Sequence, residues 1–289
     1  STTDPLSYSL ESRGIGEGAG WSLPVTTLPF DGSVVAGTGL APREVAYYKL
    51  TVPANTPSMQ LKLTPQGAGE ALLLVRHGRL PNVWATSSYD SDNGSYLMGK
   101  RLSKSGNEYF YKYQPYNGEY ITAGDYYVAV VSEGPSPVIG EVGVGTVDYT
   151  LTAEMVSINQ QGTTPIILTT ANNEANPVSW INQTLESGQQ KIYRYQVDSN
   201  LYAAEVRLLN ATGAPYMSLA EDSVGKIPII SDSYGSEEGG TNPESQSYQV
   251  LTKIYPSGVH TVTVAANKLS NLDTNATYDL VVIAKEIEA

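Results

Sequence analysis

Oxygen-bearing side chains of the kind that bind hard cations gather in one short stretch of the sequence. Asp90, Asp92 and Asn93 stand just before Gly94, and carboxylate and amide oxygens in a turn are ligands that Ca²⁺ prefers. The stretch is not an EF-hand loop, because Gly94 occupies the fifth ligand position and no glutamate follows at the twelfth. We therefore expect a calcium site here. The alternative is that Asp and Asn stand there because they favour turns.

Tyrosines crowd the segment from residue 109 to residue 120, which reads YFYKYQPYNGEY. If its first part is a strand, alternate tyrosines share one face, because successive side chains point to opposite sides. That face is either part of a tyrosine-rich sandwich or a surface that stacks on sugars or on a protein neighbour. The candidate ligand or interface residues are Tyr109, Tyr111, Tyr113, Tyr116 and Tyr120.

Residues suited to catalysis are scarce. His77 and His260 are the two histidines, and we interpret both as structural because each lies in or beside a run typical of a strand. The sequence contains no G-x-S-x-G, no H-E-x-x-H and no phosphate-binding glycine loop. We expect no catalytic residues. A carboxylate pair such as Glu119 and Asp125 leaves a glycosidase as an alternative, because the geometry of such a pair is invisible in sequence.

The composition and the first residues narrow the class of protein. The 289 residues carry a net charge of −12 and no cysteine, so disulfides and thiolate metal sites are excluded. Basic residues are scattered singly, which disfavours nucleic acid as a partner. No apolar run has the length of a membrane span. The chain opens with small polar residues, Ser1 to Asp4, and we expect an extracellular or cell-surface protein whose signal peptide has been removed.

Strand patterns fill the chain, and helical periodicity is hard to find. Short alternating runs lie between turn-forming residues, as at 47–52, 59–63, 126–131, 149–153, 192–197, 204–209, 259–265 and 278–283. Many short strands with turns between them predict an all-β fold of two tandem antiparallel β-sandwich domains. We place an extended arm at residues 1–25, the first domain at 26–158 and the second at 159–289.

The two halves read as one repeat. Tyr48 aligns with Tyr193, and the same spacing along the chain pairs Leu61 with Val206, Leu63 with Leu208, Leu72 with Met217 and Leu74 with Leu219. The last strands align through Tyr149 and Tyr278 at a shorter spacing, which we attribute to longer loops in the first half. Sequons for N-glycosylation stand at Asn93, Asn182, Asn210 and Asn275.

The first half contains YYKLTVPA at 47–54, GAGEALLLVRHG at 67–78, SSYD at 87–90 and GDYYV at 124–128. In this order, these motifs resemble the bacterial pre-peptidase C-terminal domain, and the resemblance implies that the sandwich domains are jelly-roll-like. The second half keeps the strand skeleton. The family has two acidic residues where this chain has Glu70 and Leu72, and related sandwiches use such positions for Ca²⁺. The resemblance thus adds Glu70 to the candidate calcium ligands, and the leucine weakens that expectation.

We therefore predict a non-catalytic structural or adhesive protein, the self-assembling subunit of an extracellular filament or surface layer, with other copies of itself as partners. In this hypothesis, residues 1–25 donate a strand to the sheet edge of the next copy, an open-ended contact. A module that binds glycan or protein matrix, like those appended to secreted hydrolases, is one alternative, and a glycosidase is another.

Overall fold

The computed structural model describes residues 22–83, 100–102, 105–113, 120–133, 145–156, 165–197, 201–213, 215–222, 238–239, 249–254, 256–266 and 275–286. Within these ranges the regular elements are strands, and none is a helix. No helix suited to crossing a membrane is found in that part of the chain. Residues 1–21 of the expected arm lie outside the described residues, and Val25, the arm's last residue, begins the first strand.

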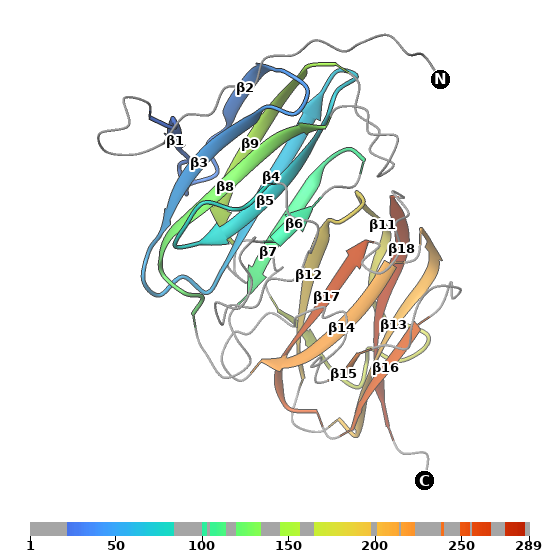
Figure 1. Ribbon diagram of the computed structural model, residues 1–289. Coiled ribbons are helices and arrows are strands. Elements are labelled where there is room, and N and C mark those ends of the chain that lie inside the picture. The colour runs from blue at the N-terminus through green and yellow to red at the C-terminus, as the bar shows by residue number, and fades with distance from the viewer. Residues whose placement is uncertain are drawn as a thin grey trace.

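Two sheets form the first sandwich (Figure 1). One has the strand order β1-β3-β8-β5-β6, and the other has the order β2-β9-β4-β7. The strands are β1 (Val25–Thr27), β2 (Val35–Leu40), β3 (Val45–Val52), β4 (Ser58–Gln66), β5 (Glu70–His77), β6 (Lys100–Leu102), β7 (Glu108–Tyr113), β8 (Gly124–Glu133) and β9 (Val147–Met155).

The second sandwich repeats this arrangement strand for strand. Its sheets have the orders β10-β12-β17-β14-β15 and β11-β18-β13-β16. The strands are β10 (Ile166–Leu168), β11 (Val178–Leu185), β12 (Gln190–Val197), β13 (Ala203–Thr212), β14 (Pro215–Asp222), β15 (Glu238–Gly239), β16 (Gln249–Ile254), β17 (Gly258–Ala266) and β18 (Ala276–Lys285). The fold is thus all-β with two tandem sandwiches, as the sequence predicts.

The strand pairs are antiparallel apart from the short first strand of each sandwich. β1 pairs in parallel with β3, and β10 pairs in parallel with β12. β1 and β10 are edge strands of their five-stranded sheets, and each covers part of the longer strand beside it. A covered strand resists pairing with other chains. This parallel start departs from the purely antiparallel sandwich that alternation alone suggests.

Apolar side chains from the facing sheets form one core in each sandwich. Leu61 and Leu63 of β4 are fully buried with Val128 and Val130 of β8. Burying a side chain of this size contributes roughly 1.5–3 kcal/mol. The corresponding residues of the second sandwich are buried in the same way: Val206, Leu208, Val262 and Val264.

A pair of tyrosines crosses each core. The hydroxyls of Tyr48 and Tyr149 lie 2.7 Å apart, with the rings nearly perpendicular at 88°. The hydroxyls of Tyr193 and Tyr278 are also 2.7 Å apart, with an angle of 87°. Burial raises the pKa of Tyr149 and of Tyr278 above the ordinary tyrosine value. The tyrosines that align the two halves in sequence therefore occupy equivalent places.

One part of the sequence alignment is wrong by a residue. Leu73 pairs with Val130, and Met217 pairs with Val264, so Leu73 and not Leu72 is the counterpart of Met217. By the same shift, the counterpart of Leu219 is Val75 and not Leu74. The cause is that residues 71–75 are all buried. Leu72 and Leu74 join a small cluster on the outer face of the sheet, so the unbroken apolar run gives no information on register.

The turn before the third strand of each sandwich has the same conformation. We call residues 41–44 the first turn and residues 186–189 the second turn. In the first, the Glu44 amide donates to the Ala41 carbonyl at 2.9 Å, and in the second Gln189 donates to Glu186 at 2.9 Å. A side-chain oxygen at the fourth position accepts from the first amide in both. The repeat thus extends to loop geometry.

Candidate functional site

A tyrosine face lies on the outer surface of the first sandwich. We define it by Tyr109 and Tyr111 of β7 and Lys62 of β4. β7 is an edge strand that pairs with β4, where Lys62 stands opposite Tyr109. The rings of Tyr109 and Tyr111 are parallel, with centroids 6.3 Å apart, and the Lys62 ammonium lies 5.1 Å from the centre of the Tyr109 ring. The alternation of a strand therefore places the predicted tyrosines side by side.

The second turn of the other sandwich packs against this face. The Tyr109 hydroxyl and the Asn107 amide both donate to the Glu186 carboxylate, the latter at 2.7 Å. The Lys62 ammonium lies 3.7 Å from the same carboxylate. Figure 1 shows β7 beside β12, and the Gln190 amide at the start of β12 donates to the Tyr111 hydroxyl at 3.2 Å. These contacts form the joint between the two sandwiches.

The joint combines a buried tyrosine with a carboxylate that is partly open to solvent, because the Glu186 side chain is 49% exposed. Burial first, and the hydrogen bond to Glu186 second, raise the pKa of Tyr109. Burial also raises the pKa of Tyr111. The hydrogen bond from Tyr109, followed by the one from Asn107, lowers the pKa of Glu186. The carboxylate is therefore held ionised and the phenols protonated, which is the arrangement that binds the two sandwiches together.

Acid is expected to loosen the joint. The pKa of Glu186 is lower in the folded chain than its ordinary value. Its contribution to stability is therefore fully present above the unfolded pKa, about 4.3, and is lost as pH falls through the folded value. Small-angle scattering should show a larger radius of gyration as pH falls below about 4, before either sandwich unfolds. Glu186→Gln should lack this transition, and an unchanged transition in that variant would remove Glu186 as its cause.

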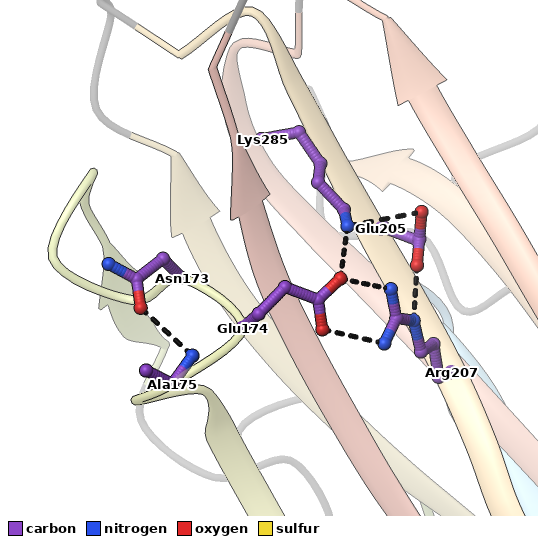
Figure 2. Close-up of polar contacts among 6 residues, drawn as sticks. All are labelled: Asn173, Glu174, Ala175, Glu205, Arg207 and Lys285. Atoms are coloured by element: carbon purple, nitrogen blue, oxygen red, sulfur yellow. Dashed lines mark hydrogen bonds and ion pairs between the residues drawn. The ribbon is translucent and has the colours of Figure 1, made fainter. Parts of the chain in front are cut away.

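A second polar cluster ties a loop to the outer face of the second sandwich (Figure 2). Glu174 lies on the loop between β10 and β11. Its carboxylate accepts two hydrogen bonds from the Arg207 guanidinium of β13, at 2.8 and 2.5 Å, in a bidentate ion pair. Lys285 of β18 also contacts Glu174, and Glu205 of β13 contacts both bases. The bond from Arg207, then that from Lys285, lowers the pKa of Glu174 to about 2. The network stays ionised far into acid.

The candidate calcium ligands are not brought together by the described residues. Asp90, Asp92 and Asn93 lie outside them. Glu70, at the start of β5, accepts from the Gly106 amide at 3.2 and 3.1 Å. No group of three or more His, Cys, Asp or Glu suited to a metal ion occurs in the described part of the chain.

The remaining predicted aromatic and catalytic candidates are dispersed. Tyr113 ends β7 opposite Ser58, Tyr116 lies outside the described residues, and Tyr120 is 45% exposed. His77 lies 3.1 Å from the Ala123 carbonyl, and His260 is buried and stacks on Tyr195. Asp125 accepts a hydrogen bond from Thr51 at 2.7 Å, and Glu119 lies outside the described residues.

Three of the four sequons fall on described residues, and all three asparagines are exposed. Asn182 and Asn210 have positive φ values of 54° and 51°, and both donate to the Asp279 carboxylate. Asn275 accepts from the Ser187 amide at 3.2 Å. Asn93 lies outside the described residues.

Sequence reasoning missed the residues that the tyrosines contact in the joint. Glu186, Gln190 and Lys62 carry no motif, and the joint links residues that are remote in sequence. Their role follows from the packing of one sandwich on the other, which periodicity does not encode.

Comparison with known proteins yields no family. No protein-family model matches the chain, and no curated protein matches it. The resemblance to the pre-peptidase C-terminal domain thus gains no support from a family match. Among solved structures, the CUB1-EGF-CUB2 domain of human MASP-1/3 is 9% identical with a TM-score of 0.20, covering 88% of this chain and 99% of that one. The structure of naturally occurring empty particles of cowpea mosaic virus is 11% identical with a TM-score of 0.24, and the match covers 88% of this chain and 89% of that one. At these TM-scores the likeness carries no argument about function.

Proposed function

We propose that this chain is a non-catalytic structural or adhesive protein of the cell exterior, the subunit of a filament or surface layer. The observation that carries this proposal is the joint. Two sandwiches of identical strand order are connected in series by a specific contact between a turn of one and a face of the other. If a contact of this heterologous kind also forms between copies of the chain, it continues indefinitely unless its rotation closes a ring.

The burial and hydrogen bonding of Tyr109 support a structural role over glycan binding. A sugar-stacking surface needs aromatic faces open to solvent, but Tyr109 is 7% exposed and its hydroxyl is bonded to Glu186. Tyrosine also suits a protein joint, because it buries a large area with little loss of rotamer freedom. The tyrosine face thus acts as an internal interface in this molecule.

Assembly of the purified chain tests the proposal. Light scattering over a wide range of concentrations should show growth well beyond the 31.0 kDa chain, and negative-stain electron microscopy should show filaments or sheets. The same measurements with a chelator separate assembly that needs Ca²⁺ from assembly that does not. A monomer at every concentration, with retention on a polysaccharide or matrix array, would instead favour the binding-module alternative.

A further inference from the structure

Three sequons that are far apart in the sequence meet at one corner of the second sandwich. They begin at Asn182, Asn210 and Asn275. Each ends in a threonine, and the three threonines stand in one row across three adjacent strands. Thr277 of β18 pairs with Thr184 of β11 on one side and with Thr212 of β13 on the other. The hydroxyls of Thr212 and Thr277 lie 2.6 Å apart. The fold therefore brings together three acceptor motifs that the sequence leaves scattered.

The acceptor asparagines of β11 and β13 flank a single carboxylate. Asp279 of β18 accepts the Asn182 backbone amide at 2.7 Å and the Asn210 side-chain amide at 2.8 Å. Each asparagine stands where its strand shifts register against β18. Each also has a positive φ, a conformation that asparagine adopts more readily than most residues. Strands two positions apart in a sheet are separated by roughly 9.5 Å, so the two acceptors are near neighbours.

The third acceptor lies at the same end of the sheet. Gly213 follows Thr212, and a Cβ at Gly213 would lie 2.1 Å from the Asn275 carbonyl oxygen. The Asn275 side-chain oxygen accepts the Ser187 amide at 3.2 Å. Ser187 follows Glu186 in the second turn, so this acceptor borders the joint. All three asparagines are exposed with both sandwiches in place.

From this convergence we infer that the corner carries a cluster of N-linked glycans, attached at Asn182, Asn210 and Asn275. The inference rests on the part of the proposed function that places the chain outside the cell, because N-glycans are attached to exported chains. The donor is an oligosaccharide on a lipid phosphate carrier, used by an oligosaccharyltransferase. In the transfer, the asparagine Nδ2 bonds the anomeric carbon of the sugar and loses one proton. The bond from that carbon to the phosphate oxygen breaks, and the lipid phosphate leaves.

Every hydrogen bond described at the three asparagines is compatible with this modification. Asn182 bonds Asp279 through its backbone amide, which the transfer leaves unchanged. Nδ2 of Asn210 has two hydrogens and keeps one after the transfer, and that hydrogen remains available to Asp279. Asn275 uses its side-chain oxygen, which takes no part in the new bond. The folded corner therefore accommodates the modified asparagines without loss of a described partner.

A glycan at this corner covers an open edge of the sheet. β11 is an edge strand in the order β11-β18-β13-β16, and Ile181, the residue before Asn182, is 50% exposed. An exposed apolar side chain on an edge strand favours pairing with other chains unless something covers it. A glycan is bulky and solubilising. The modification at Asn182 thus protects β11 from pairing with the sheets of other molecules.

Glycopeptide mass spectrometry of the protein purified from its source tests the inference. We expect an oligosaccharide on each of the three asparagines, and an intact mass above the 31.0 kDa of the chain. In the full-length chain produced in the same host, Thr184→Ala should remove the glycan from Asn182 and leave the other two in place, because a sequon needs a hydroxyl two residues after the asparagine. Thr184→Ser is the matched control and should keep all three.

Aggregation gives a second readout, on the role of the glycan at β11. Thr184 is exposed, so neither substitution should change thermal unfolding by more than about 0.5 kcal/mol. Light scattering at a fixed concentration should show severalfold more irregular aggregate in Thr184→Ala than in the wild type or in Thr184→Ser. Equal aggregation in the two variants would contradict the protective role of this glycan.

The outcomes separate the inference from the proposed function. Glycans on two or three of the corner asparagines, with loss at Asn182 in Thr184→Ala, support the cluster. Glycans on one or none of them in the protein from its source overturn it, and filaments or sheets in the same sample then leave the structural role intact. Glycans on a chain that stays monomeric at every concentration support the cluster and overturn the structural role.

Discussion

Tyr109→Ala is expected to open the joint between the two sandwiches. The substitution removes a buried ring that stacks on Tyr111, lies beneath Lys62 and donates a hydrogen bond to the Glu186 carboxylate. A buried interface tyrosine whose charged partner is partly open to solvent contributes about 2 kcal/mol. The equilibrium constant for closing the joint should therefore fall about thirtyfold.

The Gln190 amide reports on this opening directly. It donates to the Tyr111 hydroxyl across the joint, so its hydrogen exchange, followed by NMR, should speed up in Tyr109→Ala. The other amides of the β12–β17 pair, from Lys191 onward, are internal to the second sandwich and should stay protected. Tyr120→Ala is the matched control, because Tyr120 is 45% exposed, and its effect should be within about 0.5 kcal/mol. Unchanged exchange at Gln190 in Tyr109→Ala would contradict the role given to this ring.

Gly37→Ala is expected to lower the free energy of unfolding of the first sandwich by about 3 kcal/mol. A Cβ at this position would lie 2.2 Å from Cζ of Tyr149 and 2.6 Å from its hydroxyl oxygen. The Tyr149 ring is 2% exposed, and its hydroxyl bonds Tyr48. The ring therefore has to move, and the movement breaks the buried hydroxyl pair.

A neighbouring glycine separates this clash from a general intolerance of alanine. Gly39 has a φ of +64°, and a Cβ there would meet no atom within 4 Å. Gly39→Ala should therefore cost only the strain of the left-handed region, about 1 kcal/mol. Urea denaturation measures both variants. Equal destabilisation by the two substitutions would show that backbone strain, and not the Tyr149 ring, sets the cost at Gly37.

The strands could be predicted from sequence because alternation and burial agree along most of them. In β4 and β13, buried and half-exposed residues take turns, and the period of two marks each strand and its inner face. The register of β5 could not be predicted, because Ala71 to Val75 are buried on both sides. The parallel pairing of β1 and β10 was also beyond sequence, since three-residue strands carry too little pattern to show a direction.

The candidate site was half predictable. The spacing of Tyr109 and Tyr111 indicated a shared face, and it left open whether sugars, a neighbour or the chain's own core would cover it. Glu186 decides this in the structure, and its only sequence feature is a place in a polar turn. Asp90, Asp92 and Asn93 predict a Ca²⁺ site, and these residues lie outside the described part of the chain. Long-range partners of this kind are set by tertiary packing, which short-range pattern does not contain.

The hydroxyl pair in the core of the first sandwich couples two positions that lie far apart in the sequence. Replacing either Tyr48 or Tyr149 by phenylalanine would leave the other buried hydroxyl without this bond, and an unsatisfied buried polar group costs free energy. Replacing both would remove the donor and the acceptor together, which can be nearly neutral. The two tyrosines are therefore expected to tolerate a joint change better than a change at one position.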